Sequence, residues 1–153
     1  MLVQVRPYAP LTDLEPCLKI WRQASEVGHP FLSSEKLDAD AIKVREIYMP
    51  NAEILVIEVG KKIAGFIALI GDFVGGLFVD PEAHRMGIGR RLVDAAKQSR
   101  AELTVDVYAQ NENAISFYGA VGFREIGRKP TDDQGRPHPL IVMKLGEEGS
   151  AIA

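Results

Sequence analysis

Apolar residues recur at helical spacing in the first third of the chain. Between residues 13 and 28 they follow one helical face, with Asp13 or Thr12 as the N-cap. Asp13 is the better cap, because Pro16 then falls in the first turn, where its missing N–H matters little. A second helix is expected from about Ser34 to Met49, where the following proline would stop it.

Shorter apolar runs with turn residues between them indicate strands. Residues 54–71 read as two strands around a tight turn at Gly60–Lys61, and Gly75–Gly76 suggest a bulge in the strand that follows. The remaining strands are expected at 2–6, 73–79, 103–108, 123–128 and 140–145. Two later helices are expected at 88–100 and 113–121, the second one ending at Gly122.

This order of elements predicts an α/β (α+β) fold. An antiparallel meander is followed by strand–helix–strand–helix and a closing hairpin, with one right-handed parallel crossover. We expect a mixed, mostly antiparallel twisted sheet of six to seven strands, flanked by about four helices. A length of 153 residues suits one domain, over 1–145, and the segment 146–153 reads as a disordered tail.

Composition narrows the function classes. A net charge of −3 makes general binding to nucleic acid or to an anionic membrane a poor expectation. The sequence shows neither a signal peptide nor an apolar run long enough for a membrane helix, so a cytoplasmic location is expected. Cys17 is the only cysteine, which excludes an intrachain disulfide and a cysteine metal cluster. No metal is expected.

The candidate chemistry starts at a glycine-rich turn. The segment LFVDPEAHRMGIGRRL (77–92) runs from a strand into a helix that begins near Gly87-Ile88-Gly89, with Arg85 and Arg90 adding positive charge. Unpaired N–H groups at a helix start bind phosphate when glycines allow close approach. The third glycine of a dinucleotide fingerprint is absent, and so is a Walker loop. The alternative is a helix start that binds nothing.

A second segment, NENAISFYGAVGF (111–123), carries a tyrosine on a predicted helix. Taken alone, Tyr118 is more simply a core residue with its hydroxyl at the edge, and Asn111 a helix cap. Together the two segments resemble the acetyl-CoA site of the GNAT N-acetyltransferase superfamily. That family has a Q/R-x-x-G-x-G/A turn after its fourth strand, and downstream an Asn followed by a helix with F-Y-x-x-x-G-F. The stretches IWRQASEVGHPFLSSE and DDQGRPHPL also resemble its small bacterial YjaB-type members.

One position departs from the family pattern. The family's Gln or Arg stands three residues before the first glycine, where this chain has His84, with Arg85 next to it. Backbone amides supply most of the phosphate contacts in the family, so the resemblance still implies a site. It also implies a sheet that is splayed between the fourth and fifth strands.

The resemblance implies transfer of an acetyl group from acetyl-CoA to a primary amine by direct attack. It places the cofactor against Leu77, Phe78, Val79, Arg85, Met86, Gly87, Ile88, Gly89, Arg90 and Asn111. A backbone N–H within 77–79 would hold the oxyanion, and the same stretch would pair with pantetheine. Tyr118 is the implied general acid for the leaving thiolate. Asp106 is the candidate base; it could instead only attract a cationic substrate, and water could carry the proton.

The acceptor is less defined. Trp21, His29 and Phe31 could line its site, and Asp132, Asp133, Arg136 and His138 could shape its choice from the loop before the last strand. Either a protein lysine or N-terminus or a small amine is possible, and the protein could be a monomer or a homodimer. A non-catalytic acetyl-CoA sensor is the alternative function, and an interaction protein without a ligand is the third. We expect a bulky residue at Gly89 to block the diphosphate with little unfolding.

Overall fold

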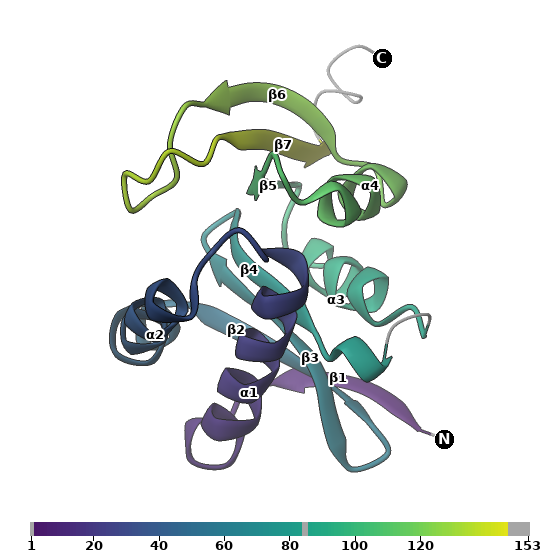
Figure 1. Ribbon diagram of the computed structural model, residues 1–153. Coiled ribbons are helices and arrows are strands. Elements are labelled where there is room, and N and C mark those ends of the chain that lie inside the picture. Colours follow the sequence, from purple (N-terminus) through teal and green to yellow (C-terminus); the bar gives the residue numbers. More distant parts are fainter. Residues whose placement is uncertain (1, 84–85, 147–153) are drawn as a thin grey trace, which may run out of the picture.

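The computed structural model describes residues 2–83 and 86–146. Figure 1 shows helices packed around an open sheet, with α1 and α2 in front of the strands β1 to β4. The elements in chain order are β1 (Val3–Pro7), α1 (Pro10–Gly28), α2 (Ser34–Lys43), the π-helical turn η1 (Val44–Tyr48), the 3-10 turn η2 (Met49–Asn51), β2 (Glu53–Val59), β3 (Lys62–Ile70), β4 (Phe73–Val79), the 3-10 turn η3 (Pro81–Ala83), α3 (Ile88–Lys97), β5 (Glu102–Tyr108), α4 (Glu112–Ala120), β6 (Arg124–Lys129) and β7 (Leu140–Gly146).

The described strands form one seven-stranded sheet in the order β1-β2-β3-β4-β5-β7-β6. Only β4 and β5 run parallel within it; the other neighbours are antiparallel. The predicted mixed, mostly antiparallel sheet with four α-helices is therefore confirmed. Gly146 ends β7, so it belongs to a strand, and the rest of the predicted tail lies outside the described residues.

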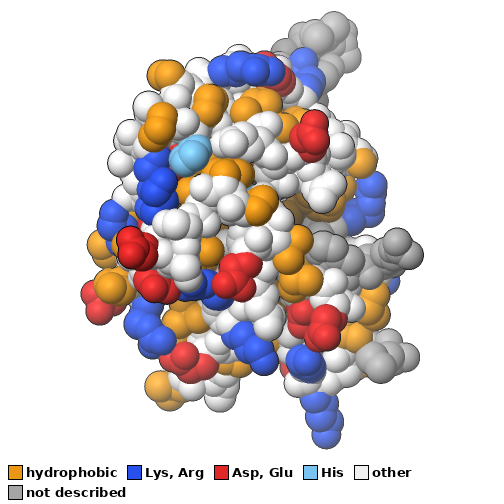
Figure 2. Space-filling view, viewed as in Figure 1, with side chains coloured by type: hydrophobic (Ala, Val, Ile, Leu, Met, Phe, Trp, Pro, Cys, Tyr) orange, Lys and Arg blue, Asp and Glu red, His pale blue; other side chains and the backbone are white. Residues whose placement is uncertain are grey.

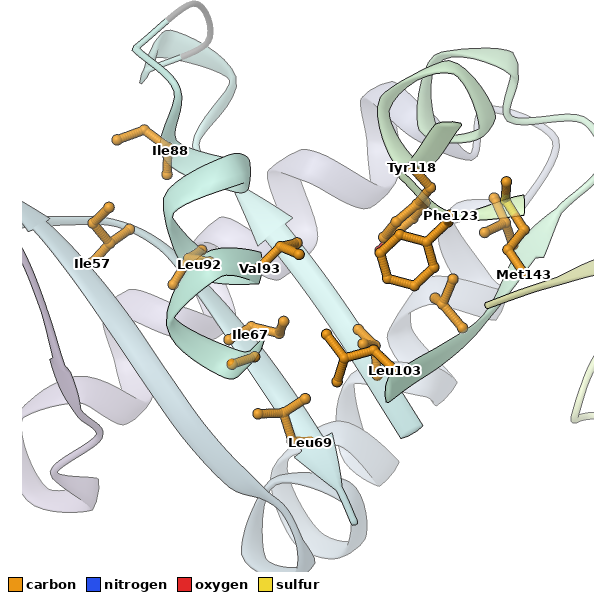
Figure 3. Packing of buried hydrophobic residues seen from close by; sticks show 14 of the residues in the cluster. Ile57, Ile67, Leu69, Ile88, Leu92, Val93, Leu103, Tyr118, Phe123 and Met143 are labelled. Carbon is orange, nitrogen blue, oxygen red and sulfur yellow. The ribbon is translucent and has the colours of Figure 1, made fainter. Parts of the chain in front are cut away.

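Alternation along the strands separates two hydrophobic clusters, one on each face of the sheet. On one face, Ile57 and Ile67 pack with α3 and α4, and Figure 3 shows Ile88, Leu92 and Val93 pointing from α3 toward the sheet. On the other face, the neighbouring residues of β2 and β3, Val56 and Phe66, belong to the cluster that α1 and α2 cover. These two layers place α3 and α4 opposite α1 and α2.

The start of α1 differs from the predicted one. The helix begins at Pro10, whose missing N–H costs nothing at the first helical position, and Ala9 is the N-cap residue. Asp13 lies in the first turn and reaches back, so that its Oδ2 accepts the Ala9 N–H at 2.7 Å. Arg6 donates two further hydrogen bonds to the same carboxylate. Pro16 therefore lies inside the helix and not in its first turn.

The predicted helix over 34–49 changes its winding partway. Ser33 caps α2 by accepting the Lys36 N–H, and regular α-helix ends at Lys43. The chain then widens into the π-helical turn η1, in which the Met49 N–H bonds to the Val44 carbonyl. Both Val44 and Met49 are buried, so the wider turn brings two apolar side chains to the core.

The sheet splits between β4 and β5. Among the described residues these strands pair only at Phe73–Thr104 and Val74–Val105, and beyond that point β4 is paired with β3 alone. The β3–β4 register skips Gly75, which confirms the predicted bulge. An added Cβ at Gly76 would lie 2.4 Å from the Phe78 ring, so a glycine is needed for that ring to lie back on the strand. The splay expected from the family resemblance is thus present.

Candidate functional site

A cavity of about 460 Å³ opens at the split. Its lining residues come from both faces of the sheet: Val105, Val107 and Tyr118 belong to the α3–α4 face, and Trp21 and Phe66 to the α1–α2 face. The end of β4, including Leu77 and Phe78, contributes the edge between them. The cavity therefore connects the two faces through the gap that the missing β4–β5 pairs leave.

The glycine-rich turn lies at the start of α3. Gly87 is the N-cap residue and takes a left-handed conformation, with φ at 69°, which a residue with a side chain rarely adopts. Among the described residues no side chain caps this helix end, so its first N–H groups are available to an anion. Ile88 is buried in the core and can contribute only its backbone N–H. His84 and Arg85 lie outside the described residues.

The two predicted segments meet at Gly89. An added Cβ there would lie 2.8 and 2.9 Å from carbons of the Phe117 ring on α4. Arg90 reinforces this contact by donating to the Ala120 carbonyl at the end of α4, at 3.3 Å. Gly89 thus lets α3 and α4 pack closely. Because those Phe117 atoms are the outer end of a side chain, a bulkier residue at Gly89 requires the Phe117 ring to shift, and the expectation that folding would stay nearly unchanged remains a prediction.

Tyr118 lies on α4 where the cavity passes between the two half-sheets. Its ring packs edge-on against Phe117 and Phe123, with ring centres 5.2 and 5.1 Å apart, and Figure 3 shows it next to Phe123. Within the described part of the chain its hydroxyl has no hydrogen-bond partner, and the residue lines the cavity. Burial raises the pKa of this hydroxyl above its ordinary value, which keeps it protonated at neutral pH.

Asp106 lies on β5 on the opposite face from Val105 and Val107, as the alternation predicts, and lines the same cavity. Its Oδ2 accepts a hydrogen bond from Lys129 Nζ of β6 at 2.8 Å. This bond raises the pKa of the Lys129 amine. The carboxylate is only 9% exposed while the Lys129 side chain is half-exposed, so Asp106 receives its ammonium partner from the solvent side.

Asn111 caps α4, as the simpler interpretation of it predicts. Its Oδ1 accepts the Ala114 N–H at 3.1 Å. The residue also lines the cavity, and its Nδ2 lies so close to the end of α1 that a Cβ on Gly28 would be 3.0 Å from it. Asn111 thus joins α4 to α1 across the split, and its amide group remains beside the predicted cofactor site.

The three residues predicted to line the acceptor site lie together, but not in equal roles. Trp21 and His29 line the cavity. Phe31 supports it from behind, packing on His29 and on Tyr108 with ring centres 5.7 and 5.0 Å apart. Burial lowers the pKa of His29 to about 4, so its imidazole is neutral at physiological pH.

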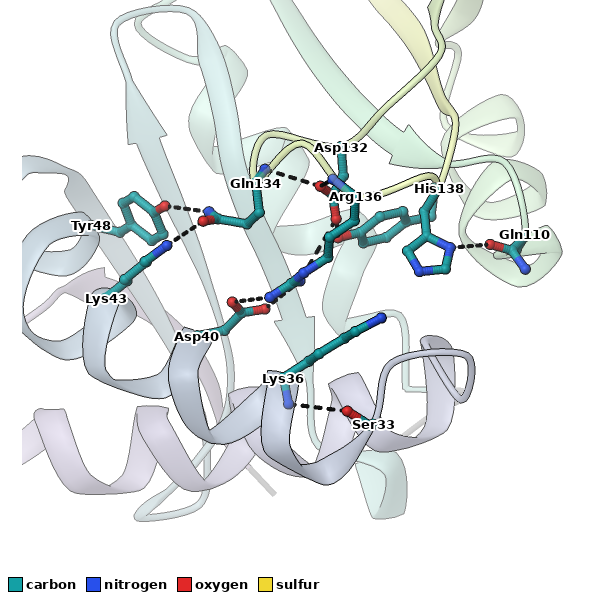
Figure 4. A network of polar contacts seen from close by, with 11 residues as sticks. Ser33, Lys36, Asp40, Lys43, Tyr48, Gln110, Asp132, Gln134, Arg136 and His138 are labelled. Atoms are coloured by element: carbon teal, nitrogen blue, oxygen red, sulfur yellow. Dashed lines mark hydrogen bonds and ion pairs between the residues drawn. The ribbon is translucent and has the colours of Figure 1, made fainter.

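The β6–β7 loop (residues 130–139) lies over α2 and closes that side of the cavity, as Figure 4 shows. Arg136 makes a bidentate ion pair with Asp40 of α2, at 2.8 and 3.0 Å. Asp132 and Asp133 line the cavity. His138 donates to or accepts from Gln110 through Nδ1 at 3.1 Å, and therefore ties the loop to the end of β5. The loop is therefore held in place by side-chain contacts and lines the cavity, and is not only a solvated turn.

Sequence reasoning missed five polar residues on this side of the cavity. Tyr108 donates to Asp132 at 2.8 Å, and Tyr48 accepts from Gln134 Nε2 at 2.9 Å. Gln134 also accepts from Lys43, and Asp40 holds Arg136. Only Tyr108 could have been found from the pattern, because strand alternation puts it on the same face as Asp106. The other contacts join segments that are distant in the sequence.

The surface charges and the helices of the described residues bear on polyanion-binding and membrane-spanning roles. Figure 2 shows acidic and basic side chains interspersed over the face that carries α1 and α2. Among the helices in 2–83 and 86–146, none is both long and apolar enough to cross a bilayer. The described residues also contain no group of three or more His, Cys, Asp or Glu side chains placed to hold a metal ion.

Comparison with known sequences agrees with this geometry. Residues 23–144 match the acetyltransferase (GNAT) domain family. The chain is 38% identical over 128 residues to the peptidyl-lysine N-acetyltransferase YjaB of Escherichia coli K12, covering 83% of this chain and 86% of that one. It is 35% identical over 113 residues to the peptidyl-lysine N-acetyltransferase YiaC of the same strain, covering 73% and 77%.

Solved structures agree as well. The solution structure of apo YjaB from E. coli matches with a TM-score of 0.86 and 34% identity, over 96% of this chain and 100% of that one. The PaiA N-acetyltransferase of Thermoplasma acidophilum, in complex with coenzyme A, shares the fold with a TM-score of 0.69 and 20% identity, over 96% and 100%. From the split sheet, the cavity through it and these matches, the chain belongs to the GNAT family and is an N-acetyltransferase.

Proposed function

We propose that the protein transfers the acetyl group of acetyl-CoA to the side-chain amine of a lysine in a protein substrate. The observation that carries this proposal is the cavity lined from both faces of the sheet. It lets the donor enter from the α3–α4 face and the acceptor from the α1–α2 face, so that the two meet at the split. Two relatives, YjaB and YiaC, are peptidyl-lysine N-acetyltransferases, and this similarity supports a lysine side chain as the acceptor rather than another primary amine.

The donor would be held mainly by backbone groups. The uncapped start of α3 offers N–H groups and the positive end of the helix dipole to the diphosphate, with Met86 and Arg90 beside it. The edge of β4 from Leu77 to Val79 is not paired with β5 and can hydrogen-bond the pantetheine amides like an added strand. Coenzyme A in a protein of the same fold, PaiA, supports this assignment. A cytoplasmic location stays a prediction.

The same edge of β4 would stabilise the transition state. When the amine attacks the thioester carbonyl, negative charge develops on the carbonyl oxygen, and a fixed backbone N–H within Leu77–Val79 can meet it. The bulge at Gly75 and the pairing with β3 hold this segment in place before the reaction. One such donor contributes about 3 to 4 kcal/mol in other enzymes.

Two side chains would move the protons. The nitrogen–carbon bond forms first and gives a tetrahedral intermediate; when this collapses, the carbon–sulfur bond breaks and the leaving thiolate takes the hydroxyl proton of Tyr118. That proton is retained until then because burial raises the pKa of the phenol. The amine loses its proton to Asp106. The contact of 2.8 Å with Lys129 Nζ shows that this carboxylate attracts an ammonium group, which supports binding of the cationic acceptor there before its proton is removed.

A direct assay tests the proposal. Wild-type protein is mixed with acetyl-CoA and a lysine-containing peptide, and both free thiol and acetyl-peptide are measured. Equal amounts of the two products are expected. If acetyl-CoA bound tightly but no amine released CoA, a sensor would explain the fold better. If acetyl-CoA at millimolar concentration did not bind in equilibrium dialysis, both the proposed acetyl-CoA-dependent activity and the sensor function would be excluded.

Replacing Tyr118 with Phe should separate chemistry from binding. General acids contribute roughly 100-fold or more to rate, so kcat should fall by about that factor while the KM for acetyl-CoA changes little. The melting temperature should stay near the wild-type value, because within the described residues the hydroxyl makes no hydrogen bond that Phe would lose. A variant with wild-type kcat would leave Tyr118 as a packing residue.

A further inference from the structure

We propose that the hydroxyl oxygen of Tyr108 accepts a hydrogen bond from the acceptor amine and so orients it for attack. This inference rests on the proposed function and adds a binding residue to it. Neither the sequence motifs nor the family resemblance points to Tyr108. The argument uses its position, the fate of its single proton and the rigidity of its surroundings.

Position comes first. Tyr108 is the last residue of β5, on the same face as Asp106, and lines the cavity that also holds Tyr118. The two tyrosines belong to different faces of the sheet: Tyr118 packs in the cluster under α3 and α4, and Tyr108 packs against the cluster under α1 and α2. An amine that enters from the α1–α2 face meets Tyr108 and Asp106 before it reaches the split.

The hydroxyl proton of Tyr108 is already used in a hydrogen bond within the protein. Its hydroxyl donates to Asp132 Oδ2 at 2.8 Å. Burial alone would raise the pKa of Asp132, but hydrogen bonds from the Arg136 backbone and from Tyr108 outweigh it, so the pKa of this carboxyl is lowered and it remains an acceptor. Burial and the same bond raise the pKa of the phenol. A hydroxyl that has given away its one proton can only accept a further hydrogen bond, and therefore selects an N–H donor.

The surroundings fix the direction of that oxygen. The ring of Tyr108 is held edge-on by His29 and Phe31, with centres 4.7 and 5.0 Å away. Asp132 is held by the backbone N–H groups of Gln134 and Arg136, at 3.0 and 2.9 Å. Because Asp132 is committed in this way, it cannot easily turn to meet the substrate itself. Figure 4 shows the loop that carries these groups.

The chemistry requires such an acceptor. An attacking amine must aim its lone pair at the thioester carbon, so its N–H bonds point back into the acceptor side. We assign one of these N–H bonds to the Tyr108 oxygen and another to the carboxylate of Asp106. The first holds the nitrogen in place and the second can take its proton.

The test is Tyr108→Phe, which keeps the ring and removes the oxygen together with its hydrogen bond to Asp132. Loss of one hydrogen bond from a charged or reacting amine should raise the peptide KM about tenfold or more, with the KM for acetyl-CoA unchanged. Direct titration of the lysine peptide into the CoA-saturated protein should show the same loss of affinity. Tyr8→Phe, a tyrosine outside the cavity lining, is the matched control.

The possible results distinguish a substrate-binding Tyr108 from a purely structural one, and both from failure of the proposed function. A peptide KM like that of the wild type would overturn the inference, and so would a lower melting temperature accompanied by changes in both KM values, since that would mark Tyr108 as structural. If the wild type itself acetylated no lysine peptide, the proposed function would fail first. That failure would be visible before any Tyr108 variant is made.

Discussion

At the scale of single residues, the partners of each polar group decide which chemistry is left to it. Asp132 has its acceptor positions taken by backbone N–H groups and by Tyr108, so it serves as a support. Tyr118 has no hydroxyl partner within the described residues, so its proton is available for the acid role proposed above. Residue types alone give no such distinction, because it depends on contacts made through the fold.

His29 gives a prediction at this scale. Burial lowers its pKa to about 4, while in the unfolded chain the pKa is about 6.5. As the pH falls from 6.5 toward 4, the unfolded chain takes up a proton that the folded protein refuses. The free energy of unfolding should therefore be lost over that window, by up to about 3 kcal/mol.

Urea unfolding at pH 7 and pH 5 measures this loss. His29→Phe keeps an aromatic ring beside Tyr108 but cannot titrate, so its stability should depend less on pH than that of the wild type. An equal pH dependence in both proteins would show that other groups cause it.

At the scale of elements, the sequence predicts most of the architecture and less of the site. The hairpin turn at Gly60–Lys61 and the bulge at Gly75 follow from local patterns and are confirmed. The start of α1 was misplaced because Asp13 acts as an acceptor from inside the helix, which resembles a cap in sequence. The contact of the β6–β7 loop with α2 could not be predicted, since Arg136 and Asp40 lie 96 positions apart in the sequence.

The start of α3 yields the next prediction. Gly87→Asp and Gly87→Asn differ in charge but hardly in size, and both residues adopt the left-handed region more readily than others. An added Cβ at Gly87 meets nothing within 4 Å. The Asp carboxylate places a negative charge at the start of α3 and should repel a diphosphate, so the KM for acetyl-CoA should rise about tenfold relative to the Asn variant.

Steady-state kinetics and thermal melting of the two variants check this. The Asp variant should melt no lower than the Asn variant, because an acidic N-cap favours the helix dipole. Identical KM values for acetyl-CoA would remove the start of α3 from the cofactor site.

At the scale of the whole molecule, two half-sheets meet at a narrow junction. β1 to β4 form one half and β5 to β7 the other, and the β6–β7 loop reaches back from the second half to α2 of the first. The bidentate pair of Arg136 and Asp40 is mostly buried, at 15% and 17% exposed, and closes this bridge. The predicted acceptor side is therefore shaped by a contact between the two halves and not by either half alone.

Breaking that bridge should weaken both stability and acceptor binding. Arg136→Gln leaves Asp40 unpaired, so the free energy of unfolding should fall by roughly 2 kcal/mol and the peptide KM should rise, with the KM for acetyl-CoA little changed. Adding Asp40→Asn should cost little more, because the partner is already lost. Denaturant unfolding of the single and double variants measures the coupling; fully additive losses would contradict a direct pair.

The short contact between β4 and β5 has a mechanical consequence. Forces that pull the halves apart concentrate on the rungs at Val74 and Val105, since the neighbouring strand pairs are much longer. A donor molecule bound between β4 and β5 would contact both strands and would add interactions where the strands do not pair with each other. Binding of the donor would therefore stabilise the position of one half-sheet relative to the other, and the protein would be more rigid with the donor bound than without it.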